Sequence, residues 1–204
     1  DERTGEKESF YFEGGIKSYV KRLNESKEVL SDDIFYVDKQ IEEAEVEIAV
    51  QYNDTYAETM KPFANNVLTP EGGTHVVGFR TALNRTINDY ARRNNLLKEK
   101  EDNLTGDDIK EGLTAVISVK IPNPEFEGQT KNKLGNPEVR GYVDKVMSEY
   151  FGYYLEENPA IAKKIVGKAT LAVDTHVYRV SHRMGLVPKT ADTPLKVEQE
   201  LLKF

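Results

Sequence analysis

The hydrophobic pattern of this chain changes its period several times, and each period predicts a different element. Strands are indicated at residues 9–13 and 34–37, and residues 44–52 alternate apolar and polar positions as a half-buried strand does. Residues 55–63 follow a turn, so we expect them to return as the antiparallel partner of that strand. A run of branched apolar residues at 113–121 predicts a buried central strand.

Helical periods separate these strands. Four segments show the helical spacing of apolar residues: 16–23, 74–97, 136–158 and 160–168. Thr74 and Asn136 are the expected N-caps of the two long helices. Their predicted apolar stripes are Val77, Leu83, Ile87 and Tyr90 in the first, and Val139, Val143, Met147, Tyr150 and Phe151 in the second. Strands with helices packed on one side predict an α+β fold with a mixed β-sheet and further helices at the C-terminal end.

The amino-acid composition limits the classes of protein to which this chain can belong. The chain has 204 residues, of which 38% are hydrophobic and 31% charged, enough for one large or two small domains. No apolar run approaches the roughly 20 residues that span a bilayer, so we expect a soluble protein with no membrane partner. Cysteine is absent, which excludes disulfides and thiolate metal sites and fits the cytoplasm as the expected location. The charged start has no signal-peptide pattern, and we interpret it as an internal cut in a longer chain.

The net charge of the chain is -7, which argues against autonomous tight binding of DNA. One segment nevertheless holds cations and few acids: Arg80, Arg85, Arg92, Arg93, Lys98 and Lys100. Two interpretations stay open for it, a solvated helix face or a surface that touches DNA.

The stretch 126–136 carries the most specific chemistry. It lies between the run at 113–121 and a long helix, so a loop there presents Gln129 and Lys131 at the tip of a rigid scaffold. A lysine offers a mobile charge and a glutamine an amide donor, which together suit a terminal phosphate. Composition alone also permits an ordinary solvated turn.

Three segments in order carry a family resemblance: Phe12-Glu13-Gly14-Gly15-Ile16, then Gly72-Gly73-Thr74-His75 leading into residues 78–90, then Gln129-Thr130-Lys131. They resemble the ATPase subunits of bacterial type IIA topoisomerases, which are the B subunits of DNA gyrase and of topoisomerase IV, over residues 8–168. The matching part is the transducer domain, which has a ribosomal-protein-like fold, and we place it at residues 1–168. The choice between gyrase and topoisomerase IV stays open.

The resemblance implies a mechanism for the loop. Lys131 would be the catalytic sensor of the terminal phosphate of ATP, and Gln129 would bind the same cofactor beside it. The loop would be held while the phosphate is present and released afterwards, which would couple ATP binding and hydrolysis to DNA strand passage.

The resemblance also implies what this chain lacks. ATP and Mg²⁺ would be bound mainly by an N-terminal ATPase domain whose pocket motifs are not in this sequence, so the fragment alone should not hydrolyse ATP. The implied partners are that domain, the DNA-cleaving subunit and DNA in the intact enzyme. The intact subunits dimerise through the missing domain, so a monomeric fragment is compatible with the resemblance and its oligomeric state stays open.

The motif at 72–75 allows two interpretations. Its glycines permit positive φ or close backbone approach, and the helix start predicts either an anion site or a tight turn with a cap. We interpret His75 as a hydrogen-bonded structural residue. The carboxylates of Asp107, Asp108 and Glu111 are typical of the first turn of a helix rather than of a metal site.

The tail at 169–204 departs from the topoisomerase pattern. Residues 170–202 resemble a fragment of the endonuclease III family of DNA glycosylases, in which Asp174 would match the catalytic aspartate. That family's lysine nucleophile and iron–sulfur cysteines have no counterpart here, so we expect no glycosylase activity. Asp174 also fits as the N-cap of an amphipathic helix. A non-enzymatic interaction module and a remnant of a repair glycosylase remain the alternative functions.

Overall fold

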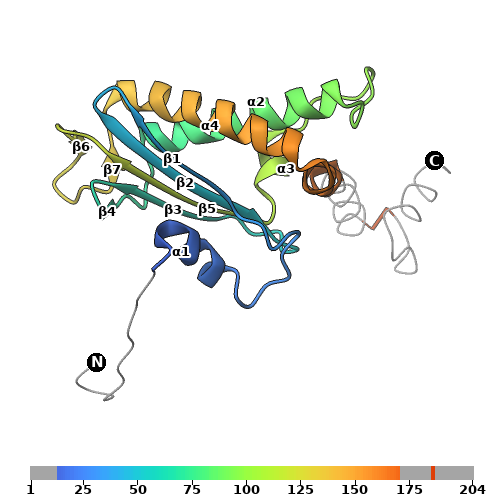
Figure 1. Ribbon diagram of the computed structural model, residues 1–204, viewed down its shortest axis with the longest axis horizontal. Coiled ribbons are helices and arrows are strands. Elements are labelled where there is room, and N and C mark those ends of the chain that lie inside the picture. Colours follow the sequence, from blue (N-terminus) through green and yellow to red (C-terminus); the bar gives the residue numbers. More distant parts are fainter. Residues whose placement is uncertain (1–12, 171–184, 187–204) are drawn as a thin grey trace, which may run out of the picture.

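The computed structural model describes residues 13–170 and 185–186, and its centre is a five-stranded mixed sheet in the order β1-β2-β5-β3-β4 (Figure 1). The strands are β1 (Phe35–Ile41), β2 (Ala44–Tyr52), β3 (Thr59–Ala64), β4 (Val67–Leu68), β5 (Leu113–Lys120), β6 (Phe126–Glu127) and β7 (Lys133–Leu134). The helices are α1 (Gly15–Leu23), α2 (Thr74–Arg93), α3 (Gly106–Lys110) and α4 (Pro137–Glu157), and the chain is helical again at 159–170. The strand predicted at 9–13 lies outside the described residues apart from residue 13, and so does most of the tail.

The sheet has a different strand order from the one that the sequence predicts. Strand β5 pairs antiparallel with β2 and parallel with β3, so it separates two strands that are neighbours in the sequence. The expected antiparallel pairing of residues 55–63 with β2 is therefore wrong. Every side chain of β5 except that of Lys120 is buried, and a strand this apolar gains most at the centre of the sheet.

Helices cover both faces of this sheet, whereas one side was expected. In Figure 1, α2 and α4 lie over one face and α1 lies against the other. On the α1 side, Val20 packs against Ala49 of β2 and Val116 of β5, and all three are fully buried. Strand β2 is thus buried on both faces from Ile48 to its end, so the half-buried strand that its alternation predicts holds only for its first half.

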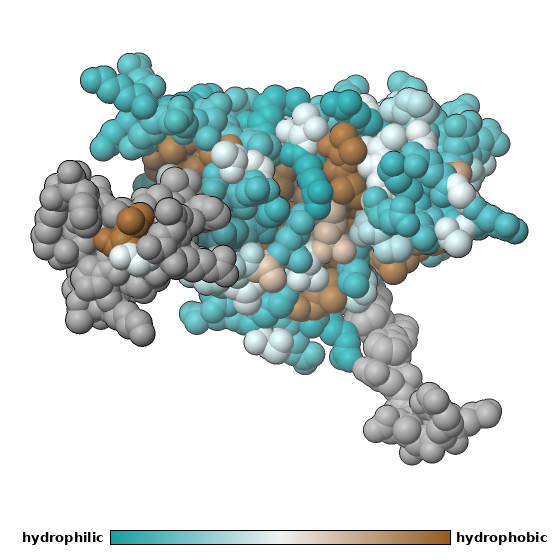
Figure 2. Space-filling view, turned by 180° about the vertical axis from the view of Figure 1, so that it is seen from behind, coloured by the Kyte–Doolittle hydropathy of each residue, from teal (hydrophilic) through white to brown (hydrophobic). Residues whose placement is uncertain are grey.

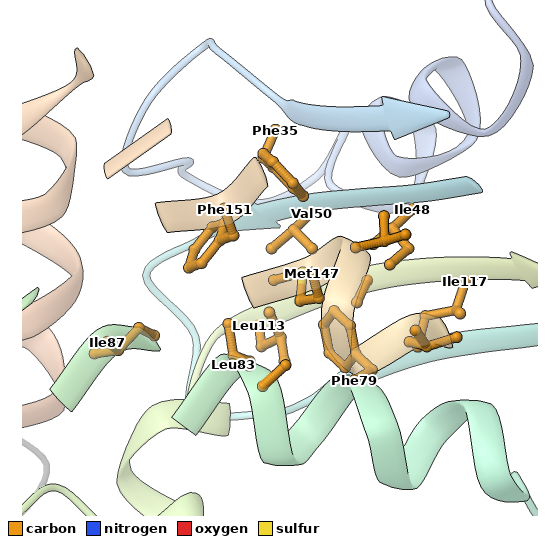
Figure 3. Close-up of a cluster of buried hydrophobic side chains, with 14 of the residues drawn as sticks. Phe35, Ile48, Val50, Phe79, Leu83, Ile87, Leu113, Ile117, Met147 and Phe151 are labelled. Carbon is orange, nitrogen blue, oxygen red and sulfur yellow. The ribbon is translucent and has the colours of Figure 1, made fainter. Parts of the chain in front are cut away.

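The main core lies between the sheet and the α2–α4 pair (Figure 3). Phe79 and Leu83 of α2 and Met147 and Phe151 of α4 point toward Ile48, Val50 and Ile117 of the sheet. The ring of Phe151 meets that of Phe35 edge-on, with centroids 5.0 Å apart.

The face of the molecule opposite to the view of Figure 1 is mainly hydrophilic (Figure 2). Figure 2 shows the molecule from behind, where teal side chains cover most of the described part and brown ones appear in small areas between them. In the part of the chain that the structure describes, no helix is both long and apolar enough to cross a membrane.

The stripe predicted for α4 is confirmed at Val139, Val143, Met147 and Phe151. The stripe predicted for α2 needs one correction. Val77 is 47% exposed, while Val76 and Phe79 are buried. Val77 lies six residues before Leu83, a spacing that places it on a different face of a helix with 3.6 residues per turn.

The two long helices approach closely near their N-terminal ends. A Cβ atom added to Gly78 of α2 would lie 2.4 Å from the carbonyl oxygen of Arg140 in α4. Only glycine allows this backbone contact.

Candidate functional site

The predicted phosphate-sensing loop forms the tip of a short hairpin. Strands β6 and β7 pair at Phe126 with Leu134 and at Glu127 with Lys133, and residues 128–132 join them. The tip is exposed at Gln129, Thr130 and Lys131. A turn closes it, because the backbone N–H of Lys131 donates to the carbonyl of Gly128 at 3.3 Å.

Lys131 differs from the other lysine of this hairpin. The Lys133 ammonium forms an ion pair with Glu127 at 3.0 Å. The Lys131 ammonium lies 5.8 Å from the centre of the Phe126 ring and has no ion pair within residues 13–170. The backbone of Lys131 has a φ of 56°, which is uncommon for a residue with a side chain. The structure therefore brings Gln129 and an uncompensated Lys131 together on one exposed loop, and their contact with a phosphate stays a prediction.

The base of the hairpin rests on the start of α2. The backbone N–H of Leu134 donates to the carbonyl of Gly72 at 3.1 Å, and that of Glu71 donates to the carbonyl of Asn132 at 3.1 Å. The side-chain amide of Asn132 also donates to the Glu71 carboxylate at 3.2 Å. The hairpin that carries Gln129, Thr130 and Lys131 is therefore in direct contact with the motif at 72–75.

Gly73 makes this contact possible. Its φ is 134°, and an added Cβ atom would lie 2.3 Å from the carbonyl oxygen and 2.5 Å from the nitrogen of Leu134. Gly73 also occupies the N-cap position of α2, so the prediction of Thr74 as the cap is wrong by one residue. The hydroxyl of Thr74 is buried without a hydrogen-bond partner in the described part of the chain. Because β7 already covers this turn, the geometry supports the tight-turn interpretation of the motif over an anion site.

His75 stabilises the same turn from inside. Its side chain is fully buried, and its Nε2 lies 3.2 Å from the hydroxyl of Thr69, which donates to the carbonyl of Pro62. Burial lowers the pKa of His75 to about 4. The imidazole is therefore neutral at neutral pH, which fits the structural role that the sequence indicates.

Asn136 connects the hairpin to α4, a role that the sequence does not reveal. It occupies the predicted N-cap position, but its side chain makes no capping bond to the helix. Instead its Oδ1 accepts from the backbone N–H of Glu125 at 2.6 Å, and its Nδ2 donates to the carbonyl of Asn123 at 3.1 Å. An Asn-Pro pair signals a helix start so strongly that contacts to the preceding segment carry no separate signal.

The arginines of α2 are occupied by partners. Arg80 pairs with Glu58 at 2.9 Å, Arg85 with Asp144 at 2.7 Å, and Arg93 with Glu156 at 3.1 Å. The Arg92 guanidinium donates to Asn103 and to two backbone carbonyls. The four arginines of this segment are therefore held by partners on the helix surface.

Of the three acidic residues predicted for the first turn of a helix, Asp107 and Asp108 lie there, in α3, whereas Glu111 is the C-cap of this short helix. Asp108 and Thr105 form a reciprocal capping box, and Asp107 pairs with Lys110 at 2.8 Å. Over the residues that the structure describes, no group of three or more histidines and carboxylates could hold a metal ion.

Comparison with known proteins gives consistent matches. A family model described as DNA gyrase B matches residues 15–183. The gyrase B protein of Streptococcus pneumoniae is 55% identical over 179 residues, which cover 87% of this chain and 28% of that protein. The chain thus spans less than a third of this relative.

Solved structures give the same result. The 43K ATPase domain of Thermus thermophilus gyrase B, in complex with an aminocoumarin, matches 88% of this chain and 48% of its own length, with 39% identity and a TM-score of 0.79. The topoisomerase IV ATP binding domain of Francisella tularensis matches 86% of this chain and 47% of its own, with 28% identity and a TM-score of 0.69.

These matches bear on the tail as well. The match to the family model continues to residue 183, beyond the boundary that we place at 168. The resemblance of residues 170–202 to a DNA glycosylase has no support among these findings. Asp174, the residue on which that resemblance depends, lies outside the described residues.

Proposed function

This chain belongs to the DNA gyrase B family, and we propose that it is the transducer part of the ATPase subunit of a type IIA topoisomerase. In this role it relays the state of bound ATP to the passage of DNA. The proposal is supported by the extent of the structural match, because the chain spans 48% of a gyrase B ATPase region and lacks the sequence motifs of a nucleotide pocket. The chain would then work with an ATPase domain upstream of it, with a DNA-cleaving subunit and with DNA.

One observation supports the site more than any other: Lys131 is a cation without an ion pair in the described chain, and it lies at the exposed tip of a hairpin with a fixed base. A phosphate has the charge and size to meet such an ammonium group, and Gln129 adds amide donors beside it. ATP, bound with Mg²⁺ mainly by the upstream domain, supplies the terminal phosphate. Lys131 then stabilises charge on that phosphate, and Gln129 orients it.

Loss of the phosphate changes what the loop can bind. Before hydrolysis the Lys131 ammonium has an anionic partner in the other domain, and after phosphate release it has none. Because a ligand shifts a conformational equilibrium only by its difference in affinity for the two states, this contact biases the relative position of the two domains. The hairpin is thus the element through which hydrolysis becomes movement.

The test uses a chimeric gyrase B protein in which this chain replaces the segment that it matches in the Streptococcus pneumoniae protein. We expect Lys131→Ala to lower the kcat of ATP hydrolysis by about 100-fold, because removing one preorganised electrostatic contact has this effect in other enzymes. Lys133→Ala is the matched control, since Lys133 lies in the same hairpin and is already paired with Glu127. If both variants hydrolyse ATP with the kcat of the parent, the loop is an ordinary solvated turn.

A further inference from the structure

We propose that Gly73 and Asn136 are positioning residues for the loop at 128–132. They clamp the base of the hairpin to the first turns of α2 and α4, so that the loop and the two helices move as one body. The meaning of this clamp for ATP hydrolysis rests on the proposed function, whereas the clamp itself is a property of this chain.

The contact with α2 is made between backbones. Leu134 donates its N–H to Gly72 and pairs with Gly73 as a parallel bridge. A side chain at position 73 would overlap the Leu134 backbone, so the two segments cannot keep this distance with any other residue there. Because Leu134 is only three residues from Lys131, this bridge fixes the loop close to its tip.

The contact with α4 is made by one buried side chain. Asn136 is 5% exposed and binds the segment that leads into β6, through the backbone of Glu125 and Asn123. It lies directly before the first residue of α4, so the segment that leads into β6 and the start of the helix are held by the same residue. The hairpin is therefore held on both of its sides, by different residues.

The two helices are in turn joined along their length. Close to the hairpin, Gly78 contacts the backbone of Arg140. One turn of α4 further on, Arg85 binds both Asp144 and Ser148, and at the far end Arg93 pairs with Glu156. Arg85 and Arg93 thus link α2 to α4 at successive positions.

These contacts determine where a displacement of the loop at 128–132 is carried. Helix α4 has 21 residues and is about 31 Å long. A body that is fixed at the hairpin and cross-linked along α2 and α4 carries a displacement of the loop to the end of α4 near residue 157. A hairpin that was loose at its base would absorb the same displacement locally.

The first test measures the clamp in the chain itself, without nucleotide. The chain has no cysteine, so spin labels at Thr130→Cys and Tyr153→Cys report one distance between the loop and α4. Both positions are exposed. We expect one narrow distance distribution in the parent and a broad one in Asn136→Ala and in Gly73→Ala.

Gly141→Ala is the matched control, because an added Cβ atom at this position in α4 meets nothing within 4 Å. It should leave the distribution narrow. If Gly73→Ala does not fold, Asn136→Ala decides the question alone. A narrow, unchanged distribution in folded Asn136→Ala would overturn the proposal.

The second test measures the consequence for hydrolysis in the chimeric protein. We expect Asn136→Ala to lower kcat about tenfold with little change in KM, since the upstream domain holds most of the nucleotide while the loop is misplaced. Asn136→Asp keeps the acceptor for the Glu125 N–H, but it turns a carboxylate oxygen toward the Asn123 carbonyl and the Glu138 carboxylate, so it should lower kcat as Asn136→Ala does. Gly141→Ala should match the parent.

The two proposals fail separately. If Lys131→Ala has no effect on turnover, the proposed function fails, while the distance measurement still decides whether the clamp exists. If Lys131→Ala abolishes turnover but Asn136→Ala retains the parent kcat, the phosphate contact stands and the positioning role is wrong.

Discussion

The tip and the base of the β6–β7 hairpin are a few residues apart and have opposite properties. The tip, at 129–131, is exposed and polar, and it contains a lysine with positive φ. At the base, Leu134 is fully buried and in backbone contact with Gly73, directly before α2. A residue that binds a transient partner must be free to meet it, while the segment that carries it must be rigid. We therefore expect substitutions at the base to change stability, and substitutions at the tip to change activity while leaving stability nearly unchanged.

The largest effect on stability should come from the base. Leu134 is fully buried, so Leu134→Ala should lower the free energy of unfolding by about 3 kcal/mol through lost burial and the cavity left behind. Leu68→Ala is the control, because Leu68 is 42% exposed. Urea unfolding of both variants checks the difference. Equal losses in both would show that the base is no more rigid than an exposed strand.

The start of α2, on which the base rests, should respond to pH through His75. Burial lowers the folded-state pKa of His75 to about 4, from 6.5 for the unfolded chain. Below pH 6.5 the unfolded state therefore binds a proton that the folded state does not, so stability is full above pH 6.5 and falls as the pH drops toward 4.

The size of this loss should reach about 3 kcal/mol. His75→Gln removes this titration, so the difference between its urea midpoints and those of the parent isolates the histidine from the carboxylates. The midpoints are measured at about pH 7.5, about pH 5.5 and about pH 4.5, which lie above and between the two pKa values. A parent and a variant that lose stability in parallel would contradict the assignment.

A smaller effect is expected from the helix pair that carries the hairpin. Arg85 is 48% exposed at its side chain and its partner Asp144 is 27% exposed, so their ion pair is partly exposed to solvent. Arg85→Ala should therefore cost about 0.5 kcal/mol in the free energy of unfolding, less at high salt. Thermal unfolding at two salt concentrations measures it. A loss as large as that of Leu134→Ala would mean that the arginine links are part of the core.

The smallest effect on stability is expected at the tip. Lys131 is exposed and has no ion pair in the described chain, so Lys131→Ala should change the free energy of unfolding by less than about 0.5 kcal/mol. The same urea experiment measures it in the isolated chain. A clear loss of stability would remove the contrast between the two ends of the hairpin, because a drop in ATP turnover could then follow from misfolding.

Much of the fold follows from local pattern. Residues 44–52, 113–121 and 136–158 form their predicted elements almost to the residue, because a clear period and a proline at each end of the last segment leave few alternatives. The exposed position of Gln129 and Lys131 also followed from the loop between strand and helix.

What the sequence does not show is long-range. Strand β3 pairs with β5 because the more deeply buried β5 occupies the centre of the sheet. The residues of β3 alone do not show this. The position of α1 on the second face depends in the same way on which strand surfaces remain uncovered. The sequence does not reveal the contacts of Gly73 and Asn136 with the hairpin, because a turn and a cap already explain these two residues. Their partners at 134 and 125 become neighbours only in the fold.

Strand β5 lies about 60 residues after its partner β2 in the sequence, which has a consequence for synthesis of the protein. Strands β1 and β2 emerge from the ribosome as an antiparallel pair, but the inner edge of β2 stays open until residues 113–120 have been made. At translation rates of about 5–20 residues per second, this edge is open on the order of seconds. Edge strands are sites where chains pair with one another. The nascent chain is therefore most exposed to aggregation before Ile117, the residue that pairs with Ile48, has been added.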